Sequence, residues 1–200
     1  MKRSFAVRAA LLCVLALAAP GCAGTIKNMR EVPAGTAAPT PSAGKALVVF
    51  MRPSGMGYAI QSSVFSVKDG QPQIVGIVAA MAKVGWQADP GKHLFMVVGE
   101  SGDFMSAELV AGRTYYALIT PRMGVWKARF SLAPVSKPQL GTGEFKEWFE
   151  RTRWAEPDER TAVWMHDNFS SVQEKYTAYY PKWMEKTPAD RPALLPDDGM

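Results

Sequence analysis

The chain has 200 residues, of which 48% are apolar and 10% aromatic, so it can form one folded domain with additions and is not wholly disordered. Its formal net charge of +5 includes Lys2, Arg3 and Arg8, which lie in a leader-like segment. The 20 basic residues that remain are matched by 18 acidic ones, so the mature chain is almost neutral. This balance gives no electrostatic reason to expect nucleic acid as a partner.

Residues 1–21 have the organisation of a secretory signal peptide. The basic residues are followed by an apolar run from Ala9 to Ala19 and then by small residues. This run is too short to cross a bilayer as a helix, which takes about 20 residues. An ordinary cleaved signal or a short anchor is the alternative interpretation.

The segment Ala19-Pro20-Gly21-Cys22 resembles the bacterial lipobox, in which small residues precede a cysteine, although Ala19 stands where the motif prefers leucine. The resemblance implies that Cys22 carries several acyl chains, becomes the mature N-terminus and attaches the protein to a membrane. Ala23 follows in place of aspartate, which implies the outer membrane with the domain facing the periplasm. Because Cys13 would leave with the leader, Cys22 has no disulfide partner in the mature chain.

Residues 22–44 have the composition of a tether. Small residues and prolines dominate, and the segment ends in Pro39-Thr40-Pro41-Ser42-Ala43-Gly44. Such a composition favours a flexible coil, whose ends would lie roughly 25 Å apart at this length. We therefore expect the lipidated cysteine and a flexible tether to precede the folded domain.

Between residues 45 and 135 the sequence predicts a run of strands. Apolar and β-branched stretches alternate with turn signals such as Asp69-Gly70 and Pro90-Gly91, at the spacing of about 8 to 12 residues that is typical of a sandwich or barrel. The expected strands cover residues 46–51, 58–67, 74–79, 84–88, 94–98, 106–110, 114–120 and 126–132. We predict a mainly β fold, an antiparallel β-sandwich of about seven to eight strands with a C-terminal α-helical extension.

Three motifs in this region carry a family resemblance: Phe50-Met51-Arg52-Pro53, Pro90-Gly91-Lys92-His93 and Ala111-Gly112-Arg113-Thr114-Tyr115-Tyr116. Their order and spacing resemble an uncharacterised bacterial lipoprotein domain of unknown function, in which lysine usually stands at the place of Arg113. The resemblance covers residues 45–135 and implies a β-sandwich similar in style to PEGA and carboxypeptidase-regulatory-like modules. The family has no established activity, so the resemblance implies no catalytic residues.

A helical extension is predicted for residues 142–187. Aromatic residues recur at helical spacing from Glu144 to Trp154. A longer apolar stripe follows, with members three or four residues apart: Met165, Phe169, Val172, Tyr176, Tyr179 and Trp183. Pro181 should kink or end this helix near Tyr180, because proline lacks the N–H that a helix interior uses. Residues 188–200 contain three prolines and adjacent acids, and we expect a loose tail there.

The aromatic residues leave two interpretations open. The helical stripe either packs on the sandwich or docks a partner or the lipid surface; its polar face carries both signs of charge, which disfavours a membrane-surface helix. Successive strand residues point to opposite faces, so one of the adjacent tyrosines should pack in the core and the other face outward. The candidate interaction surface consists of Trp148, Trp164, Trp183, Tyr115 and Tyr116.

The sequence shows no recognisable pattern of catalytic or metal-binding residues. Its two histidines, His93 and His166, lack any spacing that is typical of metal ligands. Gly99-Glu100-Ser101-Gly102-Asp103 has a superficial likeness to a serine-protease motif, but the flanking sequence does not match, and a hairpin turn accounts for it. We expect no metal, no cofactor and no catalytic residue.

These observations lead to two functional hypotheses. The first is a membrane-tethered periplasmic lipoprotein whose non-catalytic β-sandwich serves as a binding or accessory module, with an envelope protein as its partner. The alternative is an envelope hydrolase with an unrecognised site. An enzyme needs a concave pocket with convergent polar residues, whereas a binding module should expose an apolar patch.

Overall fold

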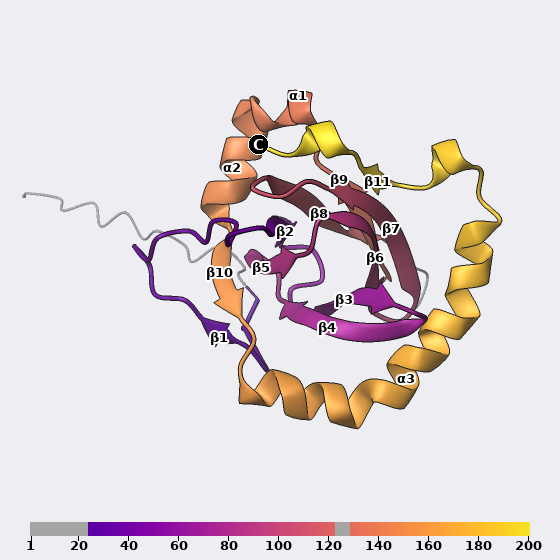
Figure 1. Cartoon of the computed structure of the whole chain (residues 1–200). Helices are drawn as coiled ribbons and strands as arrows, with labels where there is room; N and C mark the ends of the chain where they lie inside the picture. Colours follow the sequence, from indigo (N-terminus) through magenta and orange to yellow (C-terminus); the bar gives the residue numbers. More distant parts are fainter. Residues whose placement is uncertain (1–23, 123–128) are drawn as a thin grey trace, which may run out of the picture.

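The computed structural model describes residues 24–122 and 129–200, which form two β-sheets packed face to face (Figure 1). The strands of the first sheet follow the order β1 (Arg30–Glu31), β10 (Arg153–Glu156), β5 (Ala82–Ala88), β2 (Ala46–Arg52), β8 (Thr114–Arg122) and β9 (Arg129–Pro134). Those of the second follow the order β11 (Ala193–Leu194), β7 (Gly102–Leu109), β6 (Gly91–Val98), β3 (Ser62–Lys68) and β4 (Gln71–Val78). The prediction of a mainly β sandwich with a C-terminal helix is confirmed.

Both sheets are mixed rather than purely antiparallel. The central strands β2 and β8 run parallel, with Val48 opposite Tyr115. The described residues form 11 strands, more than the seven to eight expected. The additional short strands β1, β10 and β11 come from segments outside residues 45–135, where no strand was expected. They extend the edges of the two sheets and so attach both ends of the described chain to the sandwich.

The core lies between the sheets, and β2 shows how the sequence builds it. Val48 and Phe50 point inward, and the Phe50 ring meets the Phe95 ring edge-on with the centroids 5.0 Å apart. Val49 and Met51 point to the opposite face, where a second apolar cluster covers them. All seven residues of β2 are buried. The uninterrupted apolar run of β2 therefore reflects a strand that is covered on both faces.

Helices provide this second cover on each sheet (Figure 1). The short α1 (Lys137–Leu140) and α2 (Gly143–Arg151) lie over the first sheet. The long α3 (Glu159–Met184) packs on β4, β6 and β7 of the second sheet. Asp158 caps the start of α3 by accepting a hydrogen bond from the Arg160 N–H at 3.0 Å. The resulting order of layers is helix, sheet, sheet, helix.

The C-terminal third departs from the predicted helices in two places. Trp154 lies in strand β10 and not in the first helix, because Arg153 and Trp154 pair with β5 after α2 has ended. The second helix continues through Pro181 to Met184 instead of ending near Tyr180. Only one turn follows the proline, and packing of the buried Trp183 on the second sheet holds that turn in place.

Residues 188–200 are folded, which corrects the expectation of a loose tail. The short helices η1 (Pro188–Asp190) and η2 (Pro196–Asp198) flank β11, where Leu194 is buried. Thr114 and Met200 exchange two backbone hydrogen bonds, of 2.8 and 3.0 Å. The prolines of this segment lie in short helices and turns that pack on the sandwich. The proline content therefore did not indicate whether this segment is folded.

Residues 24–44 also lie against the domain, which corrects the flexible tether for this part of the chain. Met29 is buried, and its sulfur accepts a hydrogen bond from the Ile77 N–H at 3.4 Å. The leader, Cys22 and Ala23 lie outside the described residues. So does the start of the eighth predicted strand at residues 126–128; the corresponding strand β9 is described from Arg129.

Candidate functional site

The two tyrosines of the candidate interaction surface are both buried in the fold. Tyr115 points into the core; its hydroxyl donates to the Pro196 carbonyl and accepts from the Val110 N–H, each at 3.0 Å. Tyr116 points outward, as expected of one of the pair, but α2 covers it, and its ring meets that of Phe145 at 4.9 Å. Burial raises the pKa of Tyr116. Neither side chain is free to form a recognition surface.

The three tryptophans serve the packing of the helices. Trp183 is only 6% exposed and lies against Phe104, with the ring centroids 5.9 Å apart. Trp164 packs with the same cluster, whereas Trp148 of α2 joins Tyr116 over the first sheet. Of the two interpretations, the structure therefore supports packing of the aromatic stripe on the sandwich. The five predicted surface residues do not meet at one site.

The two histidines and the serine of the protease-like motif lie apart from one another in the structure. His93 is the third residue of β6, and its Nε2 lies 2.8 Å from the Asp89 carbonyl oxygen. Ser101 lies in the turn that joins β6 to β7, as predicted, so roughly 17 Å of strand separates the two. His166 is exposed on α3. This geometry assembles no nucleophile and base from these residues.

A buried lysine links the first sheet to α2. The ammonium group of Lys83 donates to the carbonyls of Phe149 and Thr152, each at 2.5 Å, at the end of the helix. It also lies over the rings of Phe149 and Trp154, at 4.1 and 5.0 Å from their centroids. Burial lowers the pKa of Lys83 to about 8. The charge sits where the helix dipole is negative, so a structural role accounts for it.

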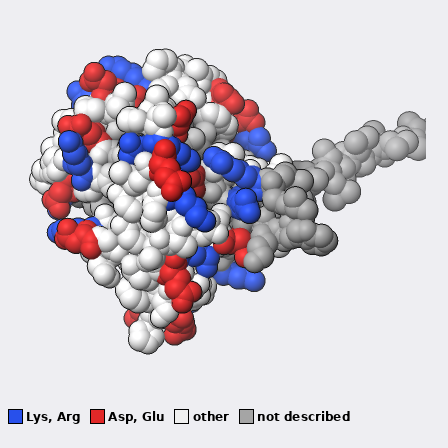
Figure 2. All heavy atoms as spheres, turned by 90° about the vertical axis from the view of Figure 1, so that its right-hand side faces the viewer, with Lys and Arg blue, Asp and Glu red and all other residues white. Residues whose placement is uncertain are grey.

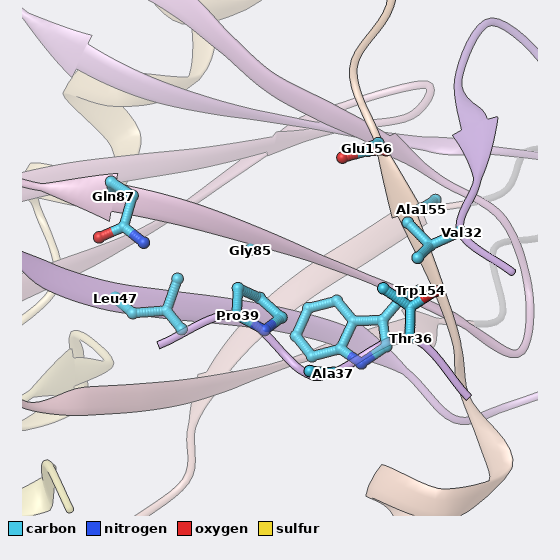
Figure 3. Close-up of a pocket in the computed structure, with 10 residues that line it drawn as sticks. All are labelled: Val32, Thr36, Ala37, Pro39, Leu47, Gly85, Gln87, Trp154, Ala155 and Glu156. Carbon is cyan, nitrogen blue, oxygen red and sulfur yellow. The ribbon is translucent and has the colours of Figure 1, made fainter. Parts of the chain in front are cut away.

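One pocket, of about 290 Å³, opens between the N-terminal segment and the outer face of the first sheet (Figure 3). Trp154 of β10 and Pro39 of the N-terminal segment lie side by side in its lining. Gly85 makes room for both: a Cβ at this position would lie 3.4 Å from Pro39 and 3.5 Å from Trp154. The pocket is lined by Val32, Thr36, Ala37, Pro39, Leu47, Gly85, Gln87, Trp154, Ala155 and Glu156.

Two polar side chains of this pocket, Glu156 and Gln87, are engaged within the chain. Glu156 forms an ion pair with Arg30. The side-chain amide of Gln87 donates to the Thr40 carbonyl and accepts from the Ser42 N–H, each at 2.9 Å. The ten lining residues, all within the described part of the chain, include no histidine, cysteine or lysine. The pocket thus offers aromatic and apolar contacts to a small chemical group. Its volume is close to the lower limit for ligand pockets, which is about 300 Å³.

A second feature lies where β2 ends, and it is built around Arg52. This side chain is fully buried, and its guanidinium donates to the carbonyls of Ile60 at 2.6 Å, Met56 at 2.8 Å and Gly57 at 2.9 Å. It also lies over the Phe130 ring, 4.6 Å from the centroid. Burial lowers the pKa of Arg52 to about 10. Arg52 thereby fixes the loop of residues 53–61, which we call the Arg52 loop.

The start of the described chain is attached to this same region. The Gly24 N–H donates to the Ala80 carbonyl at 3.1 Å, and its carbonyl accepts from Arg153 at 2.8 Å. Gln61 donates to the Thr25 carbonyl at 3.0 Å. A Cβ on Gly24 would lie 2.9 Å from the Tyr58 carbonyl oxygen, so only glycine fits here without a shift.

Charge is spread over the surface without segregation where it can be seen. Figure 2 shows the side of the molecule that lies to the right in Figure 1, and there basic and acidic groups are interspersed. This agrees with the near-neutral count of the sequence that follows the leader-like segment. Within residues 24–122 and 129–200, none of the helices is both long and apolar enough to span a bilayer.

Comparisons with known proteins identify no family. No family model matches the chain, and no curated protein matches it. Among solved structures, the chain is similar to an NMR structure of a protein from Eubacterium rectale, with 10% identity and a TM-score of 0.29. That match covers 46% of this chain and 88% of the other. The resemblance of residues 45–135 to the uncharacterised lipoprotein domain stays a prediction.

Sequence reasoning missed the pocket and the Arg52 loop as features. The signal for the loop was present: a single arginine directly follows an apolar strand, and Met56, Tyr58 and Ile60 then alternate with smaller or polar residues. The pocket left no comparable signal, because Pro39, Gly85 and Trp154 are far apart in the chain.

Proposed function

We propose that this protein is a lipid-anchored, non-catalytic accessory module of the cell envelope, held at the periplasmic face of the outer membrane by acyl chains on Cys22. The proposal starts from the leader-like residues 1–21 and the lipobox resemblance of residues 19–22. Its main structural support is the attachment of Gly24, two residues after Cys22, to Ala80 and Arg153. Cleavage before Cys22 would leave every described contact of the domain in place.

The fixed position of Gly24 also determines how such an anchor would act. A chain extends at most about 3.6 Å per residue, so the Cα atom of Cys22 lies within about 7 Å of that of Gly24. The acyl chains would therefore hold the domain directly at the bilayer and not on a long tether. Several acyl chains are sufficient for stable attachment, whereas one holds a protein only marginally.

A binding role agrees better with the pocket than hydrolysis does. Its lining includes the aromatic side chain of Trp154 and the ring of Pro39, which both lie close to Gly85. The polar side chains of Glu156 and Gln87 already have partners within the chain, so they are poorly suited to activate water or a nucleophile. We therefore favour an accessory module that binds an envelope partner over an envelope hydrolase.

The deciding experiment is the intact mass of the protein extracted from membranes of a Gram-negative host. We expect a chain that begins at Cys22 and carries acyl groups. Cys22→Ser should abolish both cleavage at this site and the added mass, whereas Cys13→Ser, in the leader, should change neither. An unmodified mature chain, or cleavage elsewhere in the wild type, would contradict the proposal.

A further inference from the structure

The Arg52 loop exposes three large apolar side chains within five residues. Met56 is 51% exposed, Tyr58 59% and Ile60 43%. The sequence from residue 53 to residue 61 contains no charged side chain. Apolar side chains at three alternate positions give the loop an exposed apolar surface, which is unfavourable in water. Such a surface indicates contact with an apolar neighbour.

The loop is held in this conformation and does not fold back onto the sandwich. The guanidinium of Arg52 donates to three backbone carbonyls of the loop, and the Ile60 N–H donates to the Gly57 carbonyl at 2.9 Å. With its backbone polar groups directed toward Arg52, the loop presents its apolar side chains outward. A prearranged loop loses less conformational entropy on contact with a partner than a flexible one does.

The position of Gly24 indicates what that neighbour is. Gly24 lies beside the Tyr58 carbonyl, and Gln61 holds Thr25, so the chain leaves the domain next to the Arg52 loop on its way to Cys22. The opposite end of the sandwich also exposes apolar side chains, those of Val110, Leu195 and Met200. It lies the length of a strand away, so an anchor on Cys22 can bring only the first end to the membrane.

We infer that the Arg52 loop is a membrane-contact element, which places Met56, Tyr58 and Ile60 in the phospholipid interface beside the acyl chains of Cys22; the inference rests on the proposed lipid anchor. The exposed Arg122 and Arg129, paired across β8 and β9 at the same end, supply positive charge toward lipid phosphates. The loop and the anchor together would set the orientation of the domain, with the pocket turned to a fixed side.

The test uses the lipidated full-length protein in vesicles of phosphatidylethanolamine and phosphatidylglycerol. Acylation blocks Cys22 and cleavage removes Cys13, so Ile60→Cys introduces one reactive thiol for an environment-sensitive fluorophore. Val110→Cys is the matched control, because Val110 is 39% exposed at the opposite end. We expect the label at position 60 to shift its emission to the blue and to be quenched by brominated lipids. The label at position 110 should do neither.

The outcomes separate the inference from the proposed function. Vesicle-bound, acylated protein with an unquenched label at position 60, or with equal quenching at both positions, would overturn the membrane-contact element and leave the anchor intact. If the intact mass shows no acyl groups, the proposed function fails first. In that case Cys22 is a free thiol, so the labels are placed in a Cys13→Ser, Cys22→Ser background. Quenching at position 60 alone would then show that the loop binds the bilayer without the anchor and would support the element itself.

Discussion

Arg52 donates from Nη1 to the carbonyl oxygen of Ile60, eight positions further along the chain, at 2.6 Å. Its other terminal nitrogen reaches the carbonyls of Met56 and Gly57, so backbone carbonyl dipoles stabilise the buried cation. Arginine suits this position because its planar group offers several donors in fixed directions. The arginine that ends β2 thereby shapes the segment that follows it.

Replacing this arginine by an uncharged residue of similar length should loosen the Arg52 loop. Arg52→Met removes the hydrogen bonds to three carbonyls, of which that of Gly57 keeps the Ile60 N–H as a donor, and we expect a loss of about 2 to 3 kcal/mol in the free energy of unfolding. Denaturant unfolding measures it, and amide hydrogen exchange should rise at residues 57–61. The exposed Arg122→Met is the control, with an expected change within about 0.5 kcal/mol. Equal effects of the two variants would contradict this role of Arg52.

Lys83 should make stability depend on pH. Burial lowers its pKa to about 8 in the folded protein, below the ordinary value of about 10.4 in the unfolded chain. Between these values the unfolded state binds more protons, so the stability of the wild type should rise with pH from about 8 to about 10. The Lys83→Met variant lacks this contribution. Over this pH range the unfolding free energy of the wild type should therefore rise relative to that of Lys83→Met. The control Lys146→Met, on the exposed side of α2, should show the same pH dependence as the wild type.

The hydroxyl of Tyr115 should contribute to stability and that of its neighbour should not. Tyr115 bonds both Val110 and the Pro196 carbonyl, so Tyr115→Phe removes a buried link between the turn before β8 and the C-terminal segment. We expect a loss of about 1 to 2 kcal/mol. Tyr116→Phe, on the other face of the same strand, should cost less. Thermal unfolding of the two variants measures the difference, and the reverse order would show that the C-terminal segment does not depend on this hydroxyl.

Attachment of α3 should depend on its last turn. Trp183→Ala empties the space against Phe104 and should destabilise the protein by about 3 kcal/mol. Phe169→Ala on the same helix removes a side chain that is 41% exposed and should have a much smaller effect. Near-ultraviolet circular dichroism and denaturant unfolding report both. If Trp183→Ala were as stable as the wild type, Trp183 would not hold α3 in place and would again be a candidate for contact with a partner.

Filling the pocket should release the N-terminal segment. At Gly85 a Cβ alone meets its neighbours at 3.2 Å or more, so Gly85→Ala should be tolerated with small shifts. The larger Gly85→Leu must displace Pro39 or Trp154. We expect faster proteolytic cleavage within residues 32–44 in the leucine variant and little change in the alanine variant. Unchanged protection in both would mean that this segment is held by contacts outside the pocket.

Much of the fold could be predicted because it depends on local patterns. The apolar runs and turn residues between positions 45 and 135 predicted strands that the structure contains, with shifted ends. The spacing of apolar residues from Met165 to Trp183 predicted the face on which α3 packs, apart from Phe169, which is 41% exposed. These patterns are informative because a strand or helix must place its apolar side chains on its covered side, whichever element covers them.

What the sequence by itself determined is therefore the run of strands between residues 45 and 135, the helical character of α2 and α3, the expected leader and the lipobox resemblance at Cys22. Tertiary structure alone decided that β2 pairs with β8 in parallel, that α2 covers Tyr116 and that Gly24 lies beside the Arg52 loop. It also decided that residues 24–44 and 188–200 join the sandwich despite their proline-rich composition. The physical reason is that each of these contacts joins residues far apart in the chain, so neither partner carries a local signal of the other.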